Sequence, residues 1–89
     1  MNNVFLDLEL METAADAKKQ IRDTLKLRDS FTGTLESLYD HLCAIGKPTS
    51  INLVNASDYS PDSPAYQSQL LKVFLDASEE NGHLKIVLL

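Results

Sequence analysis

The spacing of apolar residues along the chain predicts three strands. Residues 3–10 alternate apolar and polar side chains, the period-2 pattern of a strand with one buried face, and we expect the strand itself over 4–10. Residues 50–54 form a second, shorter run of β-branched and apolar residues. Residues 84–89 are almost continuously apolar, which is typical of a strand covered on both faces.

Between these runs the apolar residues recur every three to four positions, which is the period of an amphipathic helix. Three helices are therefore expected, at roughly 13–26, 34–45 and 64–80. Thr13 and Thr34 stand at N-cap positions, where a threonine hydroxyl can accept a hydrogen bond from an otherwise unpaired backbone N–H. Ser63 is expected to cap the last helix, with Pro64 at its first position.

The order of these elements predicts the fold class. Residues 46–48 and 81–82 contain glycine with proline or asparagine and are expected to end the second and third helices. Strands that alternate with helices favour parallel pairing, because parallel neighbours need long crossover connections. With 89 residues the chain has room for one core, so we expect a single α/β domain over 1–89 with a small parallel sheet.

The helix predicted over 34–45 has two different sides. Its core side carries Leu35, Leu38, Leu42 and Ile45. Glu36, Asp40 and Cys43 fall on another side, and Tyr39 lies on the seam between the two. The simplest interpretation of this pattern is a solvated face, in which like charges four residues apart cost a few tenths of a kcal/mol.

Charge is distributed unevenly along the chain. The net charge is −5, and it arises wholly from residues 29–89, because the acidic and basic residues of 1–28 balance. Nucleic-acid binders need clustered lysine and arginine, so this balance argues against a nucleic-acid partner. It is compatible with a basic protein partner that is attracted by charge.

The sequence also predicts a cytoplasmic location. The single cysteine, Cys43, excludes an intramolecular disulfide. No stretch reaches the roughly 20 apolar residues that cross a bilayer, so no membrane association is expected. Acidic residues interrupt any apolar run near the N-terminus, so we expect no signal peptide.

No motif for catalysis, cofactor binding or metal binding is present, and we expect no enzyme activity, cofactor or metal. His41 and Cys43 are two residues apart, on different sides of a helix, and cannot share a metal. We interpret His41 as an ordinary, partly exposed histidine. Glu36, Asp40 and Asp76 could serve as general acids or bases, but they lack a neighbouring group that would separate their roles.

Two segments resemble the barstar family of intracellular ribonuclease inhibitors. Residues 33–42, which read GTLESLYDHL, resemble the family's binding loop and second helix. Residues 71–77 and 82–88 resemble its last helix and last strand, and the likeness extends over roughly 12–89. The resemblance implies a three-stranded parallel sheet with three to four helices. It also implies an inhibitor that plugs a nuclease active site with carboxylates in place of RNA phosphates.

The resemblance also implies which residues contact the partner. Asp40 matches the central phosphate-mimicking aspartate, and Glu36 matches the aspartate one turn earlier. Tyr39 matches a tryptophan beside them, and Asp76 matches a glutamate of the last helix. The further expected contacts are Phe31, near the tyrosine that covers the nuclease site, Leu35, which matches the loop leucine, and Cys43, at the interface edge.

Departures from the family pattern indicate which partner to expect. The loop after Gly33 is one residue shorter, and 43–45 read Cys-Ala-Ile where the family has Thr-Gly-Trp. We therefore expect a monomer that forms a 1:1 complex with a basic extracellular or toxin ribonuclease related to barnase, for which it is the immunity protein. The alternatives are an adaptor for a non-nuclease protein and, less favoured, a carboxylate-dependent enzyme.

Overall fold

The computed structural model describes residues 2–27 and 30–89. The strands and α-helices are β1 (Asn2–Asp7), α1 (Ala14–Leu25), α2 (Leu35–Cys43), β2 (Thr49–Val54), α3 (Tyr66–Glu80) and β3 (Leu84–Leu88). Short 3₁₀ helices at Leu8–Leu10 and Ala56–Asp58 follow β1 and β2.

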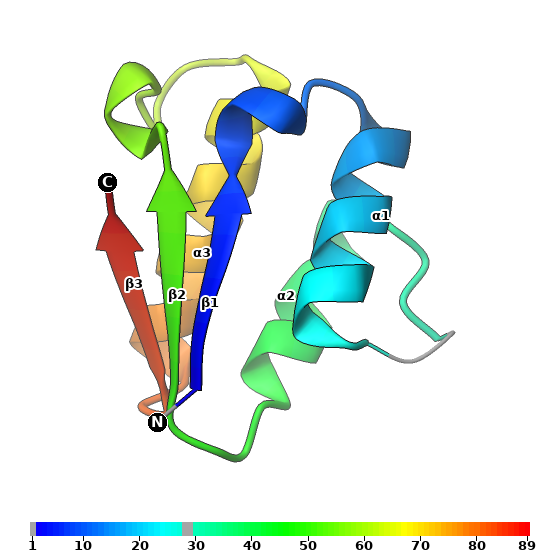
Figure 1. Cartoon of the computed structure of the whole chain (residues 1–89), viewed down its shortest axis with the longest axis vertical. Helices are drawn as coiled ribbons and strands as arrows, with labels where there is room; N and C mark the ends of the chain where they lie inside the picture. The colour runs from blue at the N-terminus through cyan, green and yellow to red at the C-terminus, as the bar shows by residue number, and fades with distance from the viewer. Residues whose placement is uncertain (1, 28–29) are drawn as a thin grey trace.

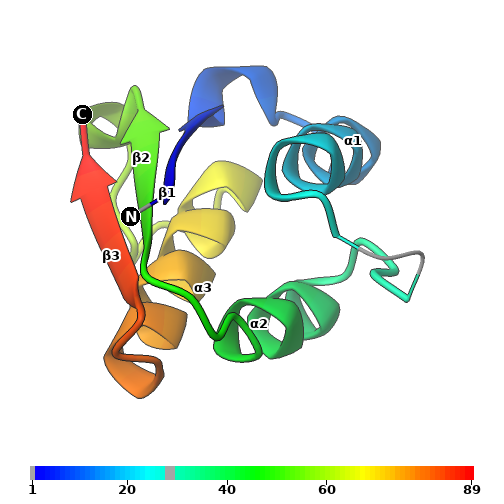
Figure 2. The same ribbon diagram turned by 60° about the horizontal axis from the view of Figure 1, so that its bottom comes forward.

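The strands form one parallel sheet in the order β1-β2-β3. In its register Val4 lies beside Ile51, which lies beside Ile86. The α-helices occupy the crossovers between parallel strands and lie on one face of the sheet (Figures 1 and 2). The predicted α/β fold, a three-stranded parallel sheet with three helices, is confirmed.

The core fills the space between the sheet and the helix layer. Leu6, Ile51 and Phe74 have no exposed surface there. None of the described helices covers the other face of the sheet (Figure 2), where Phe5 is 61% exposed. The fold is therefore a two-layer structure, and the helices carry the surface on which the candidate site was predicted.

The first strand is shorter than predicted. It ends at Asp7, because the Asp7 carboxylate accepts a hydrogen bond from the Glu9 N–H at 2.9 Å and turns the chain into a 3₁₀ helix. In that helix Leu8 is buried and Leu10 is 64% exposed. Leu8 and Leu10 extended the alternating apolar pattern past the strand. Two residues that are two positions apart in a 3₁₀ helix point in different directions, so only one of these leucines is buried.

The last helix begins later than predicted. Its N-cap is Ala65, so Ser63 and Pro64 lie before the helix and not in its first turn. The Ser63 hydroxyl accepts a hydrogen bond from the Ala65 N–H at 3.3 Å, and the Gln69 side chain donates to the Pro64 carbonyl at 2.9 Å. These side-chain contacts form a turn that precedes the helix.

The prediction that residues 84–89 are covered on both faces was wrong. β3 is an edge strand, in which Lys85 is exposed and Leu88 is 49% exposed. The central and most buried strand is β2. A short apolar run cannot distinguish an edge strand from a central one, because that position depends on which strands pair with it.

Candidate functional site

Helix α2 presents the predicted carboxylates on its exposed side. Leu38 and Leu42 are buried in the core, whereas Glu36 and Asp40 are exposed one turn apart. The Thr34 hydroxyl caps the helix, as predicted, by accepting a hydrogen bond from the Ser37 N–H at 3.0 Å. The helix ends at Cys43, two residues earlier than predicted, so its apolar stripe and its exposed carboxylates lie on a short, well-capped segment.

A network of hydrogen bonds holds the loop that leads into α2. The His41 Nδ1–H donates to the Ser37 carbonyl at 2.8 Å, and its Nε2 lies 3.1 Å from the Ser30 hydroxyl. The Ser37 hydroxyl accepts a hydrogen bond from the Thr32 N–H at 3.1 Å. His41 thus connects α2 to its own entry loop, a role that its sequence context did not indicate.

Phe31 does not lie where the resemblance implied. Its side chain is 2% exposed and belongs to the hydrophobic core, with its ring edge-on to His41 at a centroid distance of 5.5 Å. A buried ring offers no surface to a partner, so we leave Phe31 out of the contact set. It positions the loop, and Leu35, which is half-buried against the core, borders the exposed side of α2.

Tyr39 lies on α2 near two acidic residues of α3, Asp76 and Glu80. A hydrogen bond with Cys43 raises the pKa of the Tyr39 hydroxyl, and burial raises it further, as do the neighbouring charges of Cys43, Glu80 and Asp76. We call the surface formed by Glu36, Tyr39, Asp40, Cys43, Asp76 and Glu80 the α2–α3 face.

The sequence analysis missed Glu80. It stands four residues after Asp76 on α3, so both project on the same side of that helix, and this spacing was the available signal. The two acids also differ in their surroundings. The Lys72 Nζ lies 3.9 Å from the Asp76 carboxylate, so part of the Asp76 charge is already offset.

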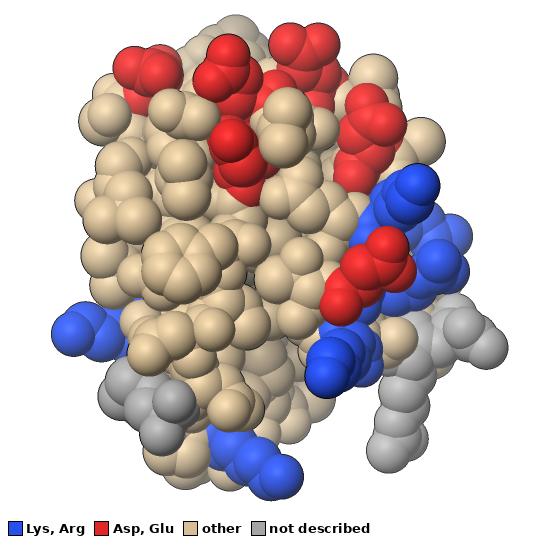
Figure 3. All heavy atoms as spheres, in the orientation of Figure 1, with Lys and Arg blue, Asp and Glu red and all other residues tan. Residues whose placement is uncertain are grey.

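A second group of acids lies elsewhere on the molecule. Burial raises the pKa of Tyr59, and the carboxylates of Glu9, Asp58, Glu12 and Asp7 raise it further. The Asn55 amide donates to Asp7 at 2.9 Å and to Glu9 at 3.1 Å. Figure 3 shows acidic side chains gathered at the carboxyl end of the sheet and basic ones over α1. Asp7, Glu9 and Glu12 lie in this group near Tyr59, apart from the basic residues of α1, and a count along the sequence does not show that separation.

The described part of the chain contains no grouping of three or more His, Cys, Asp or Glu side chains that could hold a metal ion. Within the same residues, no helix combines the length and the apolar character needed to span a bilayer.

Comparison with known proteins identifies the family. A family model described as Barstar (barnase inhibitor) matches residues 1–89. A search of curated proteins gave no match. The matched region contains the whole α2–α3 face.

Proposed function

This chain belongs to the barstar family of non-enzymatic barnase-type inhibitors, and we propose that it inhibits its nuclease by placing the α2–α3 face in the active-site cleft. The observation that carries this proposal is the exposed pair Glu36 and Asp40, one turn apart on α2, in a chain that matches the family over its full length.

Phosphate mimicry explains how such a pair inhibits. A ribonuclease stabilises phosphate charge with cationic side chains in its cleft. A carboxylate that meets an arginine there makes a charge-assisted, often bidentate, contact. It contains no bond that the nuclease can cleave, so the inhibitor occupies the cleft without turnover.

Rigidity of the α2–α3 face supports the proposal. Thr34 caps the start of α2, His41 connects α2 to its entry loop, and the Asn81 amide binds the carbonyls at the end of α2. A surface that is ordered before binding loses little conformational entropy when the complex forms. The backbone that carries Glu36 and Asp40 is thus ordered before it meets the nuclease.

We propose a partner that differs from barnase itself. Tyr39 stands where the resemblance implied a tryptophan, and the buried Phe31 removes an expected aromatic contact. Specificity in such interfaces depends on clashes and unpaired charges as well as attraction. A related toxin ribonuclease, with this chain as its cytoplasmic, monomeric immunity protein, fits these differences.

Inhibition can be tested with the purified chain. Increasing amounts are added to barnase and to ribonucleases encoded next to this chain, and cleavage of a fluorogenic RNA is followed. We expect complete inhibition of at least one of the basic ribonucleases at a 1:1 ratio, and no RNA cleavage by the chain alone. The proposal is wrong if none of these enzymes is inhibited by folded protein at micromolar concentration.

A further inference from the structure

The β1 edge of the sheet has backbone groups that form no hydrogen bond with another part of the described structure. The Asn2 N–H donates to the Pro48 carbonyl at 3.1 Å. In a parallel pair this means that the even-numbered residues of β1 direct their backbone N–H and C=O groups toward β2. The odd-numbered residues therefore direct their backbone N–H and C=O groups away from the sheet. The Gln20 side chain accepts the Asp7 N–H at 2.8 Å, but no described residue pairs with the N–H of Asn3 or Phe5.

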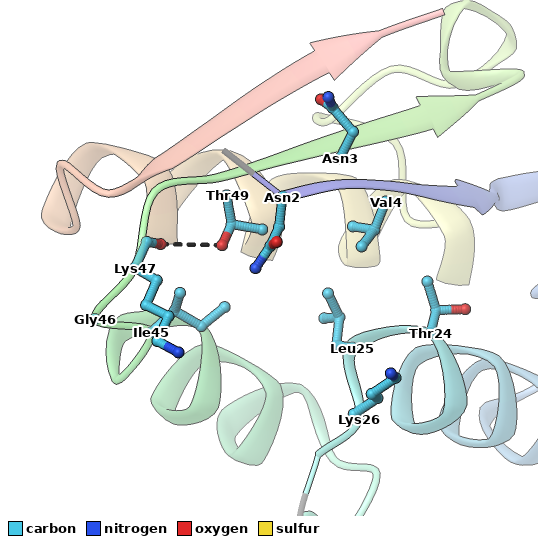
Figure 4. Close-up of a pocket in the computed structure, with 10 residues that line it drawn as sticks. All are labelled: Asn2, Asn3, Val4, Thr24, Leu25, Lys26, Ile45, Gly46, Lys47 and Thr49. Carbon is cyan, nitrogen blue, oxygen red and sulfur yellow. Dashed lines mark hydrogen bonds between the residues drawn. The ribbon is translucent and has the colours of Figure 1, made fainter.

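A hollow of about 700 Å³ lies beside this part of β1. Asn2, Asn3, Lys26 and Lys47 are among the residues that line it. Figure 4 shows the Asn2 amide directed into the hollow and the Asn3 side chain directed away from it. Asn3 thus borders the hollow with its backbone, so the unpaired edge opens directly onto this space.

Two lysines make the hollow locally basic in a protein of net charge −5. Lys26 follows α1 and Lys47 precedes β2, and neither forms an ion pair with a described residue (Figure 4). Lys26 has a left-handed backbone, with φ 54° and ψ 47°, a conformation that favours glycine.

We propose that the edge of β1 at Asn3 and Phe5 accepts an extended acidic segment of another protein as a fourth strand. The backbone of the segment would pair with the free Asn3 and Phe5 groups, and its acidic side chains would lie near Lys26 and Lys47. Parallel pairing of two β1 edges would bring like-charged lysines together, so charge disfavours a second copy of this chain in that orientation. A second copy paired in the antiparallel direction is an outcome of the test below. This site goes beyond nuclease inhibition and uses none of the residues of the α2–α3 face.

The proposal can be tested by NMR with a defined probe. The probe is an acetylated and amidated hexapeptide of alternating valine and glutamate, added to the ¹⁵N-labelled chain. We expect shifts centred on the Asn3 and Phe5 amides, and loss of those shifts when alternate peptide N–H groups are methylated. The combined Lys26→Glu and Lys47→Glu changes should weaken binding about tenfold or more.

A second pair of variants tests the backbone contribution separately. Asn3→Pro removes one edge N–H, which an edge strand tolerates, whereas Asn3→Ala keeps it. Only the proline variant should weaken peptide binding, and both should inhibit ribonuclease like the parent. The proposal is overturned if a peptide with lysine in place of glutamate binds equally well, or if N-methylation does not affect binding. It is also overturned if the chain dimerises through β1 in a concentration-dependent way.

Discussion

Asp40 is the side chain on which the proposed inhibition depends most. It is exposed near the middle of α2, one turn after Glu36 and next to Tyr39, with no cation of the described residues paired to it. Asp76 lies on the same α2–α3 face but is already close to Lys72. We therefore rank Asp40 above Asp76 as a contact for a cationic cleft.

Asp40→Ala should weaken inhibition by about 2 kcal/mol or more, the usual cost of truncating a central, desolvated contact. The extreme known case is an aspartate of barstar, so this ranking follows the family and is not an independent estimate. Folding should change little, because Asp40 is exposed. Inhibition constants and thermal melts of Asp40→Ala and of the control Asp62→Ala measure both effects. A folded Asp40→Ala variant that inhibits like the parent would place the site elsewhere.

Asn81, unlike the exposed Asp40, is buried and contributes to stability, with 9% of its surface exposed. Its amide nitrogen donates to the carbonyls of Leu42 at 3.0 Å and Ile45 at 2.8 Å, and its oxygen accepts the His83 N–H at 3.0 Å. The last carbonyls of a helix have no partner within the helix, so a buried helix end needs such donors. Asn81 thereby joins the end of α2 to the start of β3.

Asn81→Asp should lower the free energy of unfolding by about 2–3 kcal/mol, because it replaces the donor by a charge that faces carbonyl oxygens. Urea denaturation of this variant and of Asn3→Asp, at an exposed position, measures the difference. Equal stability of the two variants would show that the amide contacts of Asn81 contribute nothing.

At the scale of the element, the position of α2 depends on the conformation of its entry loop. Gly33 has φ +89°, and a Cβ added there would lie 2.8 Å from Lys18 Cδ and 3.1 Å from Lys18 Cβ. The loop thus needs glycine both for its backbone conformation and for its close approach to α1. Gly46 does not have a positive φ, and a Cβ there would meet no atom within 4 Å.

Gly33→Ala should therefore destabilise the fold by about 1–2 kcal/mol. It should also weaken inhibition, because the loop that leads into α2 would have to move. Gly46→Ala should change stability by no more than about 0.5–1 kcal/mol. Chemical denaturation and inhibition assays of both variants provide the comparison. Similar losses in the two variants would mean that the loop conformation has no special importance.

At the scale of the whole molecule, Glu80 of the α2–α3 face and Asp58 of the second acidic group lie at opposite ends of the strands. Glu80 ends α3 just before β3 begins, and Asp58 follows the end of β2. The molecule measures 29 × 25 × 19 Å, whereas charges in physiological salt are screened over about 8 Å. A nuclease approaching the α2–α3 face should therefore respond to the near acids much more than to the far ones.

The association rate with the cognate nuclease should fall steeply as salt increases, while the dissociation rate changes little. Glu80→Gln should lower the association rate at low salt, and Glu12→Gln, in the far group, should leave it almost unchanged. Stopped-flow measurements over a salt series test both statements. An association rate that is independent of salt would remove electrostatic attraction from the mechanism.

The sequence by itself determined the features that act over a few residues. The hydroxyls of Thr13 and Thr34 accept backbone hydrogen bonds at the start of α1 and α2, as predicted, because an N-cap needs only its own side chain and the next turn of backbone. The helical and strand periods located the elements, and their alternation predicted the parallel sheet. The exposed positions of Glu36 and Asp40 followed from the same period.

The tertiary structure alone decided which of these surfaces are buried and which charges come together. Phe31 is buried because His41 and the core surround a loop that sequence likeness placed on the surface. Glu80 joins Tyr39 because α3 packs beside α2, although 41 positions separate them. Burial and electrostatics depend on which elements meet in space, and no period along a single element contains that information.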